Sequence, residues 1–266
     1  MNYEPPVHQL RLFFTALQFF TRLPIPAWVG FSPDWLNQAA RYFPLVGVVV
    51  AAISAALYAL AAMLLPAPVA VLIATAGAIY ATGAFHEDGF ADMCDGFGGG
   101  MTAERVLEIM KDSRIGAYGA IGTVCLLALK CTTLTCLPPL AVIGALFVAH
   151  TLSRMLATAL IWRMDYARAE GKAKPLAQTM RAGEFAIGVV TTLAVIGAVL
   201  ASGALTAAAI GAGALAAVVA TVWLARLFAR RIGGYTGDCL GAVQQVSEVM
   251  VYLGVLATLG HGAWPP

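Results

Sequence analysis

Four carboxylates lie within nine residues of the stretch FHEDGFADMCDGFGGG, residues 85–100. On a helix, Asp88, Asp92 and Asp95 stand at i, i+4 and i+7 and share one face, whereas Glu87 points about 100° away from Asp88. Three carboxylates on one face repel one another at neutral pH, so the pattern calls for a bound cation. Mg²⁺ prefers carboxylate oxygens and keeps water or phosphate in its other positions. The spacing therefore predicts a magnesium site on Asp88, Asp92 and Asp95.

The alternative for this stretch is an ordinary solvated acidic loop. Against that alternative, the residues between the acids are mostly apolar, including Phe90, Met93 and Phe97, and no Lys, Ser, Gln or Asn occurs between residues 85 and 100. The glycines at 89, 96 and 98–100 fit either the close approach of a bulky ligand or a break after a helix. We favour the metal or catalytic interpretation.

A second stretch, MKDSRIGAYG at residues 110–119, carries groups suited to phosphate. Lys111 and Arg114 supply positive charge, and Ser113 and nearby backbone N–H groups can add hydrogen bonds. The alternative is the basic cluster that commonly follows a membrane span. With a metal to neutralise phosphate, cations for a leaving group and a carboxylate base such as Asp92, the two stretches together predict phosphoryl-type transfer.

A third stretch, GGYTGDCLGAVQQVSE at residues 233–248, again combines glycines, a hydroxyl and acids. We interpret Thr236, Asp238 and Glu248 as a second ligand-binding element, with a simple turn as the alternative. Arg154 is added to the substrate-binding residues because an ionisable group inside a membrane span needs a partner or a polar cavity. Lys130 lies in the middle of another span, and the sequence assigns it no role.

The elements that must position these residues are membrane helices. Apolar residues make up 60% of the 266 residues, charged residues only 11%, and the mean hydropathy is +0.81. Runs of about 20 apolar residues are needed to cross a bilayer. We predict an all-α polytopic membrane protein, forming a single integral membrane catalytic domain over residues 1–266, with an interfacial helix over residues 8–20. The seven predicted spans are Pro44–Leu65, Pro68–Phe85, Ala117–Cys136, Pro139–Ile161, Phe185–Ala201, Leu205–Leu224 and Ala242–Leu259.

The basic residues are distributed on one side of this arrangement. Of the 16 Lys and Arg residues, only Lys130 and Arg154 fall inside predicted spans. The positive-inside rule then places the N-terminus and the loops 86–116, 162–184 and 225–241 in the cytoplasm. We expect no signal peptide, because no small-residue cleavage site follows an apolar core. The five cysteines are odd in number and form no CxxC pair, so we expect reduced thiols and no zinc site.

The three stretches, in this order, resemble the cobalamin synthase family, also called adenosylcobinamide-GDP ribazoletransferase. The early segments FFTRLPIP and RYFPLVG are similar to that family's N-terminus. The resemblance implies a Mg²⁺-dependent enzyme of the cytoplasmic (inner) membrane, with its site facing the cytoplasm. Such an enzyme joins a GDP-activated corrinoid to α-ribazole or α-ribazole 5′-phosphate and releases GMP, in the late step that attaches the nucleotide loop of vitamin B12.

Under this resemblance, Mg²⁺ on the three aspartates bridges the two phosphates, Lys111 and Arg114 stabilise the departing charge, and Asp92 accepts the hydroxyl proton. Glu87 departs from the apolar residue expected before the DG pair, so we do not assign it as a ligand. Two alternatives remain: a CDP-alcohol phosphotransferase-like enzyme, whose DxxDG motif is present without its continuation, and a cation or corrinoid transporter. We expect contact with membrane lipid and no nucleic-acid partner. The small residues of Ala194–Ala220 permit helix packing within a protomer or in a homo-oligomer.

Overall fold

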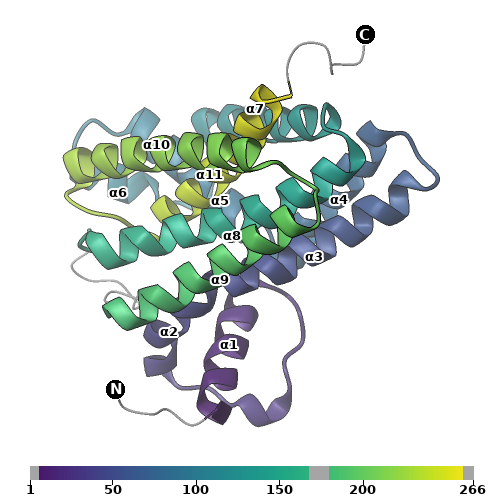
Figure 1. Ribbon diagram of the computed structural model, residues 1–266. Coiled ribbons are helices and arrows are strands. Elements are labelled where there is room, and N and C mark those ends of the chain that lie inside the picture. Colours follow the sequence, from purple (N-terminus) through teal and green to yellow (C-terminus); the bar gives the residue numbers. More distant parts are fainter. Residues whose placement is uncertain (1–5, 168–179, 260–266) are drawn as a thin grey trace.

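The computed structural model describes residues 6–167 and 180–259, which form α-helices joined by short turns (Figure 1). The all-α prediction is therefore confirmed over the described residues. The helices are α1 (Pro6–Phe20), α2 (Pro33–Ala39), α3 (Phe43–Ala62), α4 (Ala67–Thr82), α5 (Phe85–Gly99), α6 (Ala103–Ile109), α7 (Ala117–Thr135), α8 (Pro139–Arg163), α9 (Ala182–Ala201), α10 (Ala207–Ile232) and α11 (Gly237–Ala257).

Six of the described helical segments are long and apolar enough to cross a bilayer. They are α3 continued from α2, then α7, α8, α9, α10 and α11. Helices α4 and α5 meet the same criteria only as a pair, and the pair is bent by 88°. The chain is thus an integral membrane protein whose described residues include six helices able to cross a bilayer, or seven if the bent pair counts as one, in agreement with the predicted number.

The bent pair corrects the second predicted span, Pro68–Phe85. Helix α4 ends at Thr82 because Gly83 and Ala84 both adopt left-handed backbone conformations, with φ of 65° and 59°. Phe85 instead begins α5. The 16 residues of α4 reach only about 24 Å, less than the ~30 Å of a hydrocarbon core. The acidic stretch is consequently a separate helix that lies across the direction of α4.

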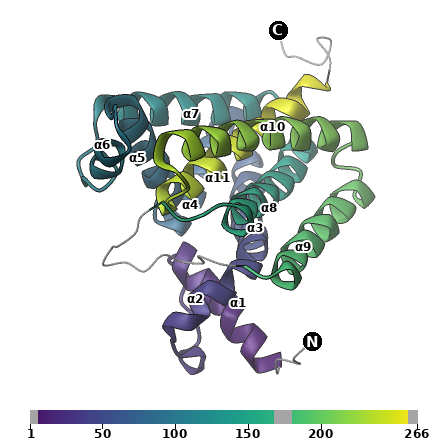
Figure 2. The ribbon, with the colours of Figure 1, turned by 90° about the vertical axis from the view of Figure 1, so that its left-hand side faces the viewer.

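The predicted N-terminal helix is present as α1, which lies with α2 at one side of the main bundle (Figure 2). Its buried face includes Leu12, Ala16 and Phe20, and Leu10 on its other face is half exposed. The Phe20 ring packs edge-on against Phe43 of α3 and stacks on His86 of α5. Helix α1 therefore supports the beginning of α5, and its interfacial position remains a prediction.

Helices α8 and α11 are the most buried spans and form the centre of the bundle. Glycines allow two helices to cross α11 at close range. A Cβ added to Gly254 would lie 2.5 Å from the Cα atom of Gly213 on α10, and one added to Gly241 would lie 3.3 Å from the Cα atom of Gly89 on α5. Gly213 lies in the small-residue range Ala194–Ala220, so that range packs within the protomer at this point. Homo-oligomer formation remains a prediction.

Candidate active site

Helix α5 places its three aspartates in three different environments. Asp88 is exposed, Asp92 is half-buried, and Asp95 is buried with 9% of its surface exposed. The helical spacing predicted from the sequence is confirmed. The environments differ because Asp95 meets the beginning of α7, which packs against α5, whereas Asp88 faces outward.

Asp95 is bound to the beginning of α7. The backbone N–H of Gly116 donates to its Oδ2 atom at 2.7 Å, and that of Gly119 donates to its Oδ1 atom at 2.8 Å. These N–H groups belong to the first turn of α7, where no helical carbonyl is available to accept them. A Cβ atom at either glycine would collide with the Asp95 carboxylate. The glycines of the RIGAYG sequence are thus explained by the close approach of Asp95, which fixes the loop between α6 and α7.

This loop borders a solvent-open cleft of about 810 Å³. The predicted residues Lys111, Arg114 and Asp95 all contribute to its lining, and Ser113 is exposed between the two basic residues without being part of that lining. The complete lining is Asp95, Gly99, Arg105, Glu108, Ile109, Lys111, Asp112, Arg114, Ile115, Gly116, Ala117 and Tyr118. The structure therefore brings Asp95 and Gly99 of the first stretch together with the second stretch in one cleft, whereas Asp88 and Asp92 do not line it.

The charges in the cleft are only partly paired. Arg114 Nη2 donates to Asp112 Oδ2 at 2.7 Å and Nε donates to Oδ1 at 3.0 Å, and this pairing lowers the pKa of Asp112 to about 2. Arg105 forms an exposed ion pair of 2.7 Å with Glu108. Among the described residues, no carboxylate lies within ion-pair distance of Lys111. Lys111 is therefore the cation of the cleft lining that has no carboxylate partner among the described residues.

The third sequence stretch meets the first where α11 crosses α5. A Cβ added to Gly89 would lie 3.0 Å from the Cα atom of Asp238, so the backbone of Asp238 touches α5 directly after Asp88. Thr236 is fully buried, and its hydroxyl caps α11 by accepting from the backbone N–H of Cys239 at 3.3 Å. The structure thus gives Thr236 a positioning task, and its substrate contact remains a prediction. Asp238 is half-buried beside the aspartate helix.

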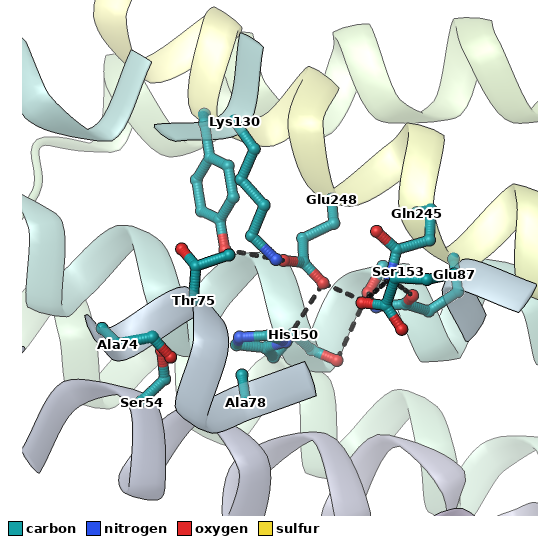
Figure 3. A network of polar contacts seen from close by, with 12 residues as sticks. Ser54, Ala74, Thr75, Ala78, Glu87, Lys130, His150, Ser153, Gln245 and Glu248 are labelled. Carbon is teal, nitrogen blue, oxygen red and sulfur yellow. Dashed lines mark hydrogen bonds and ion pairs between the residues drawn. The ribbon is translucent and has the colours of Figure 1, made fainter. Parts of the chain in front are cut away.

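Arg154 and Glu248, also predicted to bind substrate, are instead buried inside the bundle. Figure 3 shows Glu248 within a network of polar side chains. Glu248 is 0% exposed and accepts from Lys130 Nζ at 2.5 Å, His150 Nδ1 at 3.1 Å and Gln244 Nε2 at 2.6 Å. Neither Arg154 nor Glu248 lines the cleft. Lys130, to which the sequence assigned no role, is thus the direct partner of Glu248.

Sequence reasoning missed several members of this network, among them Glu87 and His150. Glu87 accepts a hydrogen bond from Gln245 Nε2 at 2.9 Å. One signal was available in the sequence: Lys130 and Glu248 are opposite charges in separate spans, and each needs a partner. Helical geometry also directed Glu87 away from the aspartates, although it could not show that Glu87 faces the bundle interior.

The carboxylates of the aspartate helix are ligands of the kind that Mg²⁺ prefers. Within residues 6–167 and 180–259, however, no three His, Cys, Asp or Glu side chains lie close enough together to hold a metal ion. Asp95 uses each of its oxygens to accept a backbone N–H. Mg²⁺ is usually held by only one or two carboxylates together with substrate phosphates, so Asp88 and Asp92 would be sufficient in number. Metal binding remains a prediction.

The fold and this site define a class: a polytopic helical membrane protein that gathers carboxylates and basic side chains at one end of its bundle. The family model described as Cobalamin-5-phosphate synthase matches residues 12–256. The chain therefore belongs to the cobalamin-5-phosphate synthase family.

Relatives of the chain carry a consistent name, adenosylcobinamide-GDP ribazoletransferase. The protein of that name from Shewanella frigidimarina is 44% identical over 261 residues, covering 94% of this chain and 96% of the relative. Those from Leptothrix cholodnii and Ralstonia pickettii are 43% and 48% identical, covering 97% and 91% of this chain and 98% and 94% of the relatives. No solved structure matches the chain.

Proposed function

We propose that this enzyme transfers the GDP-activated (adenosyl)cobinamide phosphate to α-ribazole or α-ribazole 5′-phosphate. The products are (adenosyl)cobalamin or its 5′-phosphate, together with GMP. The transfer completes the nucleotide loop of vitamin B12. The observation that carries the proposal is the cleft in which Lys111 and Arg114 lie beside the aspartate helix, in the loop that Asp95 fixes by capping the N-terminus of α7 with two hydrogen bonds. The family and the names of the relatives support the same substrates.

The reaction exchanges one P–O bond for another. A ribazole hydroxyl attacks the corrinoid-side phosphorus of the pyrophosphate, the bond to the bridging oxygen breaks, and GMP leaves with that oxygen. Lys111 and Arg114 neutralise charge on the departing GMP, and Asp92 accepts the hydroxyl proton. Asp88 and Asp92 would hold Mg²⁺, which when bound supplies positive charge to the two phosphates.

The remaining residues of the cleft suit a nucleotide. The Tyr118 ring covers the Cα atom of Gly98, where an added Cβ would lie only 2.5–2.8 Å from ring atoms, while 59% of Tyr118 is exposed. An aromatic ring with an exposed surface beside basic residues can stack on a base while the cations hold the phosphates. We assign Tyr118 to the base of the GDP group.

The cleft is proposed to face the cytoplasm in the inner membrane. Arg105, Lys111 and Arg114 lie at the cleft, and Arg231 at the end of α10 donates to the carbonyl oxygen of Gly100 at 2.6 Å, so these cations gather at one end of the bundle. The positive-inside rule favours the cytoplasm for this end. Exposed apolar side chains along α7 and α10, such as Val124 and Trp223, suit contact with lipid.

The proposed function is tested by offering two activated substrates to the purified protein with Mg²⁺. GDP-cobinamide with α-ribazole should yield GMP, whereas a CDP-alcohol donor should yield no CMP. Release of CMP without release of GMP would instead favour the CDP-alcohol phosphotransferase class. A thiol probe on residues near 95 and 238 should react only from the cytoplasmic side, and labelling from outside would contradict the proposed orientation.

A further inference from the structure

Glu87 occupies the interior face of the helix that carries the aspartates. It is 9% exposed, and its Oε1 atom accepts from Gln245 Nε2 at 2.9 Å. Its Oε2 atom is buried and has no hydrogen-bond partner. A carboxylate oxygen that is buried without a donor is costly, so a further donor is expected at this point.

Hydrogen bonds connect Glu87 to the centre of the bundle (Figure 3). Gln245 Nε2 also donates to Gln244 Oε1 at 2.9 Å, and Gln244 Nε2 donates to Glu248 Oε2 at 2.6 Å. Glu248 in turn binds Lys130 of α7 and His150 of α8. The network therefore joins α5 to α11, α7 and α8, and its energy depends on all four helices keeping their positions.

Arg154 is the cation of this network that has no direct carboxylate partner among the described residues. It is 3% exposed, its Nη1 atom donates to the carbonyl oxygen of His150 at 3.0 Å, and its Nε atom has no partner. No carboxylate lies within ion-pair distance of Arg154 among the described residues. A buried guanidinium without a negative partner costs several kcal/mol, so a link from Arg154 to a carboxylate is expected.

A water-sized space lies between the unsatisfied groups. A cavity of about 10 Å³ is lined by Glu87, His150, Arg154 and Gln245, among others. One atom of each of these four side chains is buried without a partner: Glu87 Oε2, His150 Nε2, Arg154 Nε and Gln245 Oε1. A space of this size holds about one water molecule, and a buried water needs two to four polar partners.

We propose that one internal water molecule in this cavity joins Arg154 to Glu87 and thereby anchors α5 to α8. The water accepts from Arg154 Nε–H and donates to Glu87 Oε2, and its second proton is donated to Gln245 Oε1 or to His150 Nε2. Glu87 is then a positioning residue for the aspartate helix, since Asp88 follows it directly. The consequence for turnover rests on the proposed function, whereas the water-bridged pair does not.

The pair is tested by a double-mutant cycle on the full-length protein in detergent. Glu87→Leu and Arg154→Met should each lower the thermal midpoint by at least about 5 °C, because each leaves a buried charge without its partner. The double variant should fall less than the sum of the two shifts. Glu104→Gln, which removes an exposed carboxylate on α6, is the matched control and should leave the midpoint unchanged. Additive shifts in the double variant would overturn the pairing.

Two further readouts separate positioning from general destabilisation. A high-resolution map should show a water peak within hydrogen-bond distance of both Glu87 and Arg154, and a dry cavity or a bound anion would overturn the proposal.

The positioning role is tested by the rate of GMP release per folded protein. In Glu87→Leu, kcat should fall at least about tenfold, while KM for GDP-cobinamide stays within about twofold of wild type. Glu87→Gln should recover part of kcat. An unchanged kcat would overturn the positioning role. If wild-type protein releases no GMP, the proposed function fails. The double-mutant cycle and the high-resolution map still test the water-bridged pair of Glu87 and Arg154 in that case.

Discussion

Asp95 is the carboxylate for which a structural role and a metal-binding role predict the most different stability of the protein. In Asp95→Asn, the charge is lost and one of the two acceptor oxygens becomes an NH₂ group that faces a backbone N–H of α7. A hydrogen bond to a charged group contributes about 1.5–3 kcal/mol, and loss of a helix N-cap costs about 0.5–2 kcal/mol. For this buried cap of α7 we expect the free energy of unfolding to fall by about 2–4 kcal/mol, which lowers the thermal midpoint by roughly 5–15 °C.

The assay is thermal unfolding in detergent, followed by intrinsic fluorescence with a chelator present so that no metal contributes. Asp88→Asn is the matched control, because Asp88 is exposed on the same helix, and its midpoint should stay within about 2 °C of wild type. Gly119→Ala changes the α7 side of the same hydrogen bond. It should also lower the thermal midpoint, since the added methyl group collides with Asp95. Equal midpoints for Asp95→Asn and wild type would refute the capping role of Asp95 and would favour its predicted role as a metal ligand.

Three further predictions concern buried charge, cleft charge and backbone strain. Lys130→Met should lower the yield of folded protein sharply, because it leaves Glu248 without its ammonium partner, and adding Glu248→Gln should restore part of the yield measured by size-exclusion chromatography. Asp112→Asn should lower KM for GDP-cobinamide by up to about fivefold by freeing Arg114, and an increase in KM would contradict this. The Asp112 pKa of about 2 lies below its usual 3.8, so the wild-type pair is intact above about pH 4 and is lost only toward pH 2; KM should therefore show no Asp112-dependent change between pH 5 and 8. Ala84→Gly should raise the thermal midpoint by about 2–4 °C, because it relieves about 1 kcal/mol of left-handed strain, and a lowered midpoint would count against strain at the bend.

The membrane architecture could be predicted from the sequence because hydropathy is a property of continuous segments. The apolar runs and the proline-led starts of α3 and α8 are local signals, and both helices lie where they were expected. The bend between α4 and α5 was missed because it depends on Ala84, a residue with no preference for a left-handed conformation, and on support from Phe20 of α1. That support comes from a segment distant in the sequence, which local patterns do not report.

The candidate site was predictable in its parts but not in its pairing. The i, i+4, i+7 spacing correctly placed the three aspartates along one helix, yet burial differs along that face, and Asp95 meets the N–H groups of α7 rather than solvent. Lys130 and Glu248 are separated by more than 100 residues, and only the packing of α7 on α11 brings them to 2.5 Å. Spacing within a segment predicts which side chains share a face, whereas the partner across the bundle depends on tertiary packing.

The central claim is that this chain joins two substrates and does not merely cleave one. The direct measurement is the stoichiometry of products when purified protein in lipid nanodiscs is given GDP-cobinamide, α-ribazole and Mg²⁺. We predict one cobalamin and one GMP for each GDP-cobinamide consumed, with turnover lost in Asp92→Asn although that variant remains folded. Folded wild-type protein that consumes no GDP-cobinamide, or that releases GMP without forming cobalamin, would contradict the account.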